Sequence, residues 1–64
     1  GKTFVDLVTE RRMDKARELL AHTTDRIGGI AAATGFADEA YFTRRFRQRF
    51  QLSPTQFRRR AARR

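Results

Sequence analysis

Apolar and polar positions repeat along most of this chain with the period of an α-helix. Over residues 4–21 the apolar side chains recur at mostly helical spacing, and the positions between them carry charges of both signs. Thr3 and Asp6 stand at the start of this stretch in the pattern of a capping box, with Asp in place of Glu. We therefore expect one long amphipathic helix over residues 3–21.

A short helix is expected next, after a turn that contains several good N-cap residues. Ile27, Ile30 and Ala31 recur at i, i+3 and i+4, which favours a helix. Gly28 and Gly29 lie in the same segment, and each lowers helix stability by about 0.8–1 kcal/mol relative to alanine. The pattern thus predicts a helix whose first turn is weak.

A third helix follows a glycine-containing turn. Gly35 stands where a helix would end in the left-handed conformation that glycine adopts without strain, and Asp38 is a good N-cap for a helix that runs to about Phe50. Phe42, Phe46 and Phe50 form one apolar stripe of this helix. A second stripe, rotated from the first by roughly a third of a turn, consists of Ala40, Thr43, Arg44 and Arg47.

The clearest local signal lies near the end of the chain. Ser53 is a good N-cap, Pro54 fits the first helical position, and Gln56 completes a capping box. We expect a last helix over residues 53–60 and a basic tail over 61–64. The prediction is a single all-α domain over 1–64, a small helix-turn-helix bundle of the homeodomain-like three- to four-helix type, with the helix-turn-helix at 24–50 and its second helix at about 38–50.

Length and composition exclude several classes of protein. A chain of 64 residues buries only about 60% of the surface that its unfolded form exposes, so a large enzyme core is excluded. The absence of cysteine excludes disulfides and thiolate metal sites. No apolar run approaches the roughly 20 residues that span a bilayer, and no secretory signal is recognisable. We expect a cytoplasmic protein without membrane contact.

The positive charge is concentrated in one part of the chain. The formal net charge is +8, yet residues 1–39 contain six bases and seven acids, whereas residues 40–64 contain nine arginines and no acid. Such a field favours an anionic partner, with nucleic acid first among the candidates. For Arg58–Arg64 alone, a solvated face with a disordered basic tail stays open as an alternative.

Catalytic chemistry has little support in the sequence. His22 is the only histidine, lies in a predicted turn beside threonines, and has no carboxylate at a spacing that would orient it. Ser53 is explained by capping, and the pair Gly28-Gly29 lacks the lysine and the spacing of a nucleotide-binding loop. We expect no enzyme, no cofactor and no metal site.

A larger pattern extends over essentially the whole chain. Its densest block runs Ile30-Ala31-x-x-x-Gly35-Phe36-x-Asp38-x-x-Tyr41-Phe42-x-Arg44-x-Phe46, and further positions of the pattern are Arg12-Met13, Ala16, Leu19-Leu20, Ile27, Ser53-Pro54 and Phe57-Arg58. Together these positions resemble the C-terminal DNA-binding region of AraC/XylS-type transcription regulators. Such regulators join two helix-turn-helix subdomains by a long helix. The resemblance implies that this chain comprises the joining helix and the second subdomain, and that the first subdomain and an effector-binding or dimerisation domain are missing from it.

Two positions depart from the family pattern. Gln51 stands where the family usually has glycine, which costs roughly 1 kcal/mol if the backbone is left-handed there. Arg26 and Gly29 occupy positions where the family tends to have a serine and an acidic residue. The cap of the short helix must therefore come from Asp25 or Thr24, or be weak.

The resemblance also implies which residues contact DNA. It assigns Glu39, Ala40, Thr43 and Arg44 to base edges in the major groove. Arginine can donate two hydrogen bonds to guanine, and the methyl group of Thr43 or Ala40 can contact thymine. Glu39 can accept a hydrogen bond from cytosine, or it can stabilise the N-terminus of its helix. The expected phosphate contacts are Arg47, Ser53, Thr55, Arg58, Arg59 and Arg60.

The same residues admit other interpretations. Arg45 and Arg49 lie nearer the Phe42 side, so we expect them to cover apolar surface or to pair with acids of the long helix. Exposed aromatic rings beside arginines would suit single-stranded nucleic acid, and a basic amphipathic helix would suit an anionic membrane, but the phenylalanines are needed for the core. We predict sequence-specific binding to double-stranded DNA. A module that contacts another protein, for example RNA polymerase, is the alternative.

Overall fold

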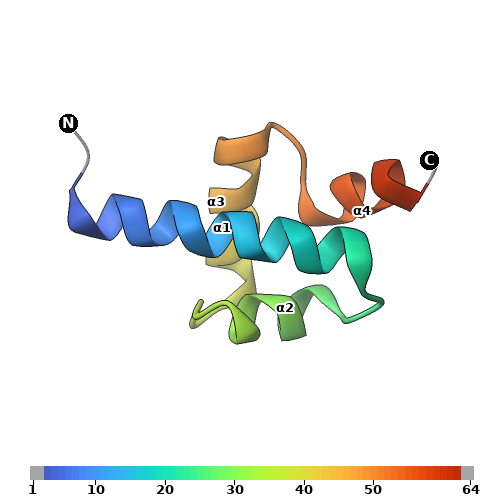
Figure 1. Cartoon of the computed structure of the whole chain (residues 1–64), viewed down its shortest axis with the longest axis horizontal. Coiled ribbons are helices and arrows are strands. Elements are labelled where there is room, and N and C mark those ends of the chain that lie inside the picture. Colours follow the sequence, from blue (N-terminus) through green and yellow to red (C-terminus); the bar gives the residue numbers. More distant parts are fainter. Residues whose placement is uncertain (1–2, 63–64) are drawn as a thin grey trace.

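Four α-helices make up the described part of the chain. The computed structural model describes residues 3–62, and their helices are α1 (Phe4–His22), α2 (Ile27–Ala33), α3 (Glu39–Phe50) and α4 (Pro54–Ala62), with no strand among them. In Figure 1, α1 lies along the long axis, α2 runs beneath it, α3 crosses it, and α4 lies beside its C-terminal end. The predicted all-α bundle is confirmed.

The long helix α1 begins where its capping box predicts. Thr3 Oγ1 accepts a hydrogen bond from the Asp6 N–H at 3.1 Å, and Asp6 Oδ2 accepts one from the Thr3 N–H at 3.2 Å. At the other end, the N–H and the hydroxyl of Thr23 both donate to the Leu19 carbonyl. His22, expected in a turn, is instead the last residue of α1, because the helix continues until Thr23 caps it.

The short helix α2 is uncapped at its start and well closed at its end. Arg26 is its N-cap and makes no side-chain hydrogen bond. The sequence analysis expected a cap from Asp25 or Thr24, or a weak cap, and the cap is weak. At the C-terminus the Phe36 N–H donates to the Ala31 carbonyl and the Gly35 N–H to the Ala32 carbonyl, which is a Schellman motif. Gly35 has a φ of 90°, so the conformation predicted for this glycine is present.

The core forms where α1, α2 and α3 meet. Asp38 Oδ1 accepts hydrogen bonds from the Ala40 and Tyr41 N–H groups and so fixes the first turn of α3. Phe42 and Phe46 of this helix are completely buried, with ring centroids 5.8 Å apart. The other buried residues of this core cluster are Met13, Ala16, Leu20, Ile30, Ala31 and Phe36. The phenylalanine stripe therefore has the structural role that the sequence predicts.

The turn into α4 contains a left-handed residue and the predicted capping box. Gln51 has a φ of 61° and so occupies the left-handed region despite its side chain. The Ser53 and Gln56 side chains each accept a hydrogen bond from the other residue's N–H. The helix then continues to Ala62, whereas the sequence analysis assigned Ala61 and beyond to a tail. Alanine has the highest helix propensity and Ala61 is half-buried, which accounts for the extension. Arg63 and Arg64, the rest of that tail, lie outside the described residues.

The N-terminal turns of α1 remain uncovered. They extend past the other helices in Figure 1, and they carry the apolar side chains of Phe4, Val5 and Leu7, of which Phe4 is 80% exposed. We refer to these three residues as the apolar overhang.

Candidate nucleic-acid interface

One exposed face of α3 gathers four of the residues expected to contact DNA. Ala40, Thr43, Arg44 and Arg47, called here the α3 stripe, line a shallow hollow of about 500 Å³ together with Gln48. Ala40, Arg44 and Arg47 are exposed, and Thr43 is half-exposed. All residues that line this hollow come from α3. The structure thus brings the four residues of the α3 stripe together on one open surface.

Aromatic packing on the opposite side of α3 anchors this helix in the core. Phe42 contacts Phe36 with ring centroids 5.2 Å apart, and Phe46 contacts both Phe50 at 4.6 Å and Phe57 at 5.9 Å. Edge-to-face and tilted aromatic pairs of this kind add about 0.5–1.5 kcal/mol each beyond the area they bury. Because its buried face is fixed in this way, α3 presents its stripe in one orientation.

An aromatic residue supports the central arginine of the stripe. The guanidinium carbon of Arg44 lies 5.9 Å from the centroid of the Tyr41 ring, and this ring lies 6.0 Å from that of Phe36. Cation–π contacts at exposed sites contribute about 0.5–1 kcal/mol. From the sequence, Tyr41 stands out only as a position of the family pattern and as one of the aromatic residues weighed for stacking on bases. In the structure, Tyr41 orients Arg44, and the i, i+3 spacing of the two residues is the signal that could have shown this contact.

Glu39 is not part of the hollow. A Cβ atom placed on Gly28 would lie 2.7 Å from Glu39 Oε1, so the carboxylate occupies the space where a side chain at position 28 would be. The N-cap of α3 is Asp38, so Glu39 does not itself cap the helix. Glu39 lies in the first turn, where a negative charge is favourable.

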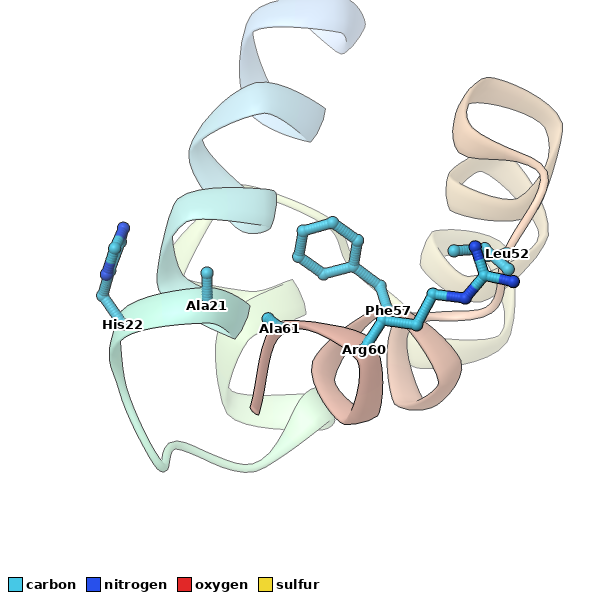
Figure 2. Close-up of a pocket in the computed structure, with 6 residues that line it drawn as sticks. All are labelled: Ala21, His22, Leu52, Phe57, Arg60 and Ala61. Atoms are coloured by element: carbon cyan, nitrogen blue, oxygen red, sulfur yellow. The ribbon is translucent and has the colours of Figure 1, made fainter. Parts of the chain in front are cut away.

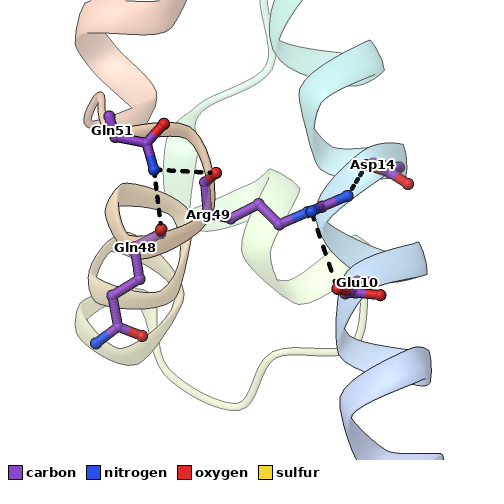
Figure 3. Close-up of polar contacts among 5 residues, drawn as sticks. All are labelled: Glu10, Asp14, Gln48, Arg49 and Gln51. Atoms are coloured by element: carbon purple, nitrogen blue, oxygen red, sulfur yellow. Dashed lines mark hydrogen bonds and ion pairs between the residues drawn. The ribbon is translucent and has the colours of Figure 1, made fainter. Parts of the chain in front are cut away.

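Two further arginines of α3 face α1 and its surroundings. Arg49 pairs with Asp14 at 3.4 Å and with Glu10 at 3.9 Å, which confirms its expected pairing with acids of the long helix (Figure 3). Arg45 donates to Gln48 Oε1 at 3.4 Å, so its hydrogen bond goes to an amide and not to an acid. Arg44 and Arg47 therefore remain as the arginines of α3 that face the hollow.

The candidate phosphate contacts between Ser53 and Arg60 do not line the α3 hollow. Ser53 is half-exposed, and Thr55 and Arg59 are exposed. Arg60 lines a different hollow, of about 400 Å³, between the end of α1 and α4; His22 and Arg60 lie on opposite sides of it in Figure 2.

Arg58 has a role that the sequence analysis missed. Its Nε donates to the Leu20 carbonyl and its Nη2 to the Thr23 carbonyl, each at 3.2 Å. Two of its five N–H groups are thereby used within the domain. Arginine near a helix C-terminus is a known means of satisfying free carbonyls, but the partner helix is 35–38 residues away in sequence, so no local pattern reveals it.

Neither a cluster of metal-binding side chains nor a membrane-spanning helix occurs among the described residues. Within residues 3–62 no group of three or more His, Cys, Asp and Glu side chains is placed to hold a metal ion. No helix in the same range is long and apolar enough to cross a membrane.

The arrangement of α2, the Gly35 turn and α3 defines a class. Two short helices joined by a tight glycine turn, the second with an open polar face, form a helix-turn-helix unit, a DNA-binding architecture. A family model described as a helix-turn-helix domain matches residues 1–60. The chain belongs to this family, in its AraC type, so it is a DNA-binding domain of transcription regulation and not an enzyme.

Known regulators show the same relationship. The chain is 42% identical over 58 residues to the regulatory protein PocR of Salmonella typhimurium, covering 91% of this chain and 19% of PocR. It is 40% identical over 60 residues to the transcriptional activator RhaR of Pectobacterium carotovorum, covering 94% of this chain and 21% of RhaR. It is 36% identical over 58 residues to the regulator YisR of Bacillus subtilis, covering 91% of this chain and 20% of YisR.

The chain spans about a fifth of the length of these curated relatives. No solved structure matches it significantly.

Proposed function

We propose that this chain binds double-stranded DNA sequence-specifically, with α3 as the recognition helix in the major groove. The observation that supports the proposal most strongly is the α3 stripe, an open polar face on a helix whose other face is fixed in the core. A major groove about 12 Å wide admits one α-helix, and the early residues of that helix meet the base edges.

The side chains of the stripe suit separate tasks in the groove. Arg44, oriented by Tyr41, donates two hydrogen bonds to guanine O6 and N7. Ala40 and Thr43 carry methyl groups that can contact thymine. Arg47, further along the helix, is assigned to a phosphate, which adds affinity without sequence information.

Ser53 and residues along α4 supply further phosphate contacts in this proposal. The Ser53 hydroxyl accepts from the Gln56 N–H and keeps its own proton to donate. Thr55, Arg59 and Arg60 contribute from the same helix. Arg58 keeps three N–H groups beyond the two that it donates to α1, so it can also contact a phosphate.

The apolar overhang supports a DNA-binding unit that consists of two helix-turn-helix subdomains. Exposed apolar side chains clustered at one helix end mark a surface that another element covers. We assign it to a first helix-turn-helix subdomain, in keeping with the family architecture, and an effector-binding or dimerisation domain would complete the parent protein. Binding to bacterial chromosomal DNA would place the protein in the cytoplasm, where RNA polymerase is a further partner.

The division of tasks between α3 and α4 is tested by two alanine substitutions. Selection of duplexes from a randomised library gives the base preference of the chain, and the same selection is repeated with Arg44→Ala and Arg60→Ala. We expect Arg44→Ala to relax the preference at one base pair, by about 1–3 kcal/mol of discrimination. Arg60→Ala should weaken all duplexes alike. Equal, sequence-independent losses in both variants would contradict the proposed recognition helix.

A protein-contact role is distinguished by competition. Generic duplex DNA at excess should displace the chain from a DNA site, whereas a complex with RNA polymerase made through α1 would persist. Persistence together with the absence of any base preference would replace the proposed function by the protein-contact alternative.

A further inference from the structure

Gly28 and Glu39 make a close contact between the two helices of the helix-turn-helix. Any side chain at position 28 would collide with the Glu39 carboxylate, since a Cβ there would lie 2.7 Å from Oε1 and 3.7 Å from the carboxyl carbon. Real Cβ atoms do not approach an oxygen this closely, so the carboxylate can lie there only because residue 28 is glycine.

The first turn of α2 gives this position a favourable field. No side chain caps α2 at Arg26, so the N–H groups of its first turn have no such acceptor. The first turn of α2 contains no acidic residue of its own. The Glu39 carboxylate lies near this turn without a hydrogen bond to it among the described residues, and its negative charge is favourable there.

Gly29 shows that the contact is particular to one glycine. A Cβ placed on Gly29 would meet nothing within 4 Å. Helix propensity disfavours both glycines equally, so propensity does not explain why position 28 lacks a side chain. The two positions differ in that the Glu39 side chain uses the space beside Gly28 and nothing uses the space beside Gly29.

From this geometry we infer that Gly28 determines the DNA specificity of the domain by holding Glu39 back from the groove. The inference rests on the proposed function. Glu39 adjoins the α3 stripe at Ala40, and a free carboxylate there would face phosphates and compete with Arg44 for base contacts. With Gly28 present, the exposed Glu39 side chain has room to lie beside α2, and in this inference Arg44 dominates the recognition.

Gly28→Ala tests the inference, because the added methyl group displaces the end of a flexible side chain and leaves the backbone in place. We expect the variant to bind duplex DNA about three- to tenfold more weakly at low salt, as a released negative charge near phosphates requires. Its base preference should change beside the position that Arg44 contacts. Gly29→Ala is the matched control and should keep the binding and the preference of the parent chain.

A double variant distinguishes the effect of the Glu39 charge from the effect of the side-chain size at position 28. Glu39→Gln keeps the size of the side chain and removes its charge. Alone it should leave the base preference unchanged, and in combination with Gly28→Ala it should restore the affinity. A preference that changes with Glu39→Gln alone would overturn the inference, since Glu39 would then contact a base in the parent chain.

A measurement made without DNA tests the inference independently of the proposed function. The carboxyl carbon resonance of Glu39, followed by NMR, should shift in Gly28→Ala and stay in place in Gly29→Ala. An unmoved resonance in Gly28→Ala would overturn the inference whatever the DNA results are. A shifted resonance in a chain that shows no preference among duplexes would instead contradict the proposed function.

Discussion

Arg58 of α4 donates from Nε to the carbonyl of Leu20 in the last turn of α1, over 3.2 Å. The last carbonyls of a helix have no partner within the helix, and a cation near them is favourable. A second hydrogen bond, to the Thr23 carbonyl, makes the contact bidentate. The half-buried Arg58 thereby links α4 to α1 by hydrogen bonds. These bonds add to the apolar packing of Phe57 against the core.

Arg58→Ala should destabilise the domain more than any other alanine substitution of an arginine in α4. Hydrogen bonds with a charged partner contribute about 1.5–3 kcal/mol, and the two carbonyls lose this donor. Urea unfolding followed by circular dichroism measures the free energy of unfolding. The matched control is Arg59→Ala, at an exposed position, which should stay within about 0.5 kcal/mol of the parent chain. Equal losses in the two variants would show that the contact does not hold α4.

Two glycine-to-alanine substitutions should change stability in opposite directions. At Gly29 the new methyl group meets nothing and improves helix propensity, so the free energy of unfolding should rise by up to about 1 kcal/mol. At Gly35 the backbone has a φ of 90°, and the methyl group would lie 3.1 Å from the Arg12 guanidinium, so the free energy should fall by about 1–2 kcal/mol. Thermal unfolding of both variants provides the measurement. A stabilised Gly35→Ala variant would contradict the turn geometry.

Binding to duplex DNA should depend strongly on salt. If the chain neutralises about four to six phosphates, log affinity should fall against log salt concentration with a slope of about −4 to −5. Fluorescence anisotropy of a labelled duplex between low and moderate salt measures this slope. Removal of one phosphate contact, as in Arg47→Ala, should reduce the slope by about one. An unchanged slope in this variant would remove Arg47 from the phosphate contacts.

The isolated chain should bind DNA only weakly. When two DNA-binding subdomains are tethered, binding of one raises the effective concentration of the other at the DNA. A single subdomain lacks this gain in affinity. Comparison of the chain with a version that carries a first helix-turn-helix subdomain should show an affinity gain of about 10²–10⁴. Equal affinities would mean that the apolar overhang has another purpose.

Structural features that depend on residues close together in the sequence were predictable. The capping boxes at Thr3 and Ser53 formed as the residue types indicate, and so did the left-handed turn at Gly35. The stripe of phenylalanines at every fourth residue identified the buried face of α3, and with it the open face. These features depend on residues at most a few positions apart, so local chemistry decides them.

Features that depend on distant residues were not predictable. The Arg58 contact with Leu20 joins positions 38 residues apart, and the approach of Glu39 to Gly28 depends on the angle between two helices. The continuation of α4 through Ala61 depends on its packing near the end of α1. A periodic pattern shows which face of a helix is buried, but not which side chain of another helix meets it.

The most direct test of the proposed recognition helix is a titration of amide NMR shifts with mixed-sequence duplex DNA at low and moderate salt. We expect the shifts to be concentrated at residues 38–47, with a second group around residues 53–60, because groove contact and phosphate contact involve these segments. Shifts confined to the last arginines of the chain, or spread thinly over all of them, would mean that DNA contacts only a basic surface, and would contradict major-groove recognition by α3.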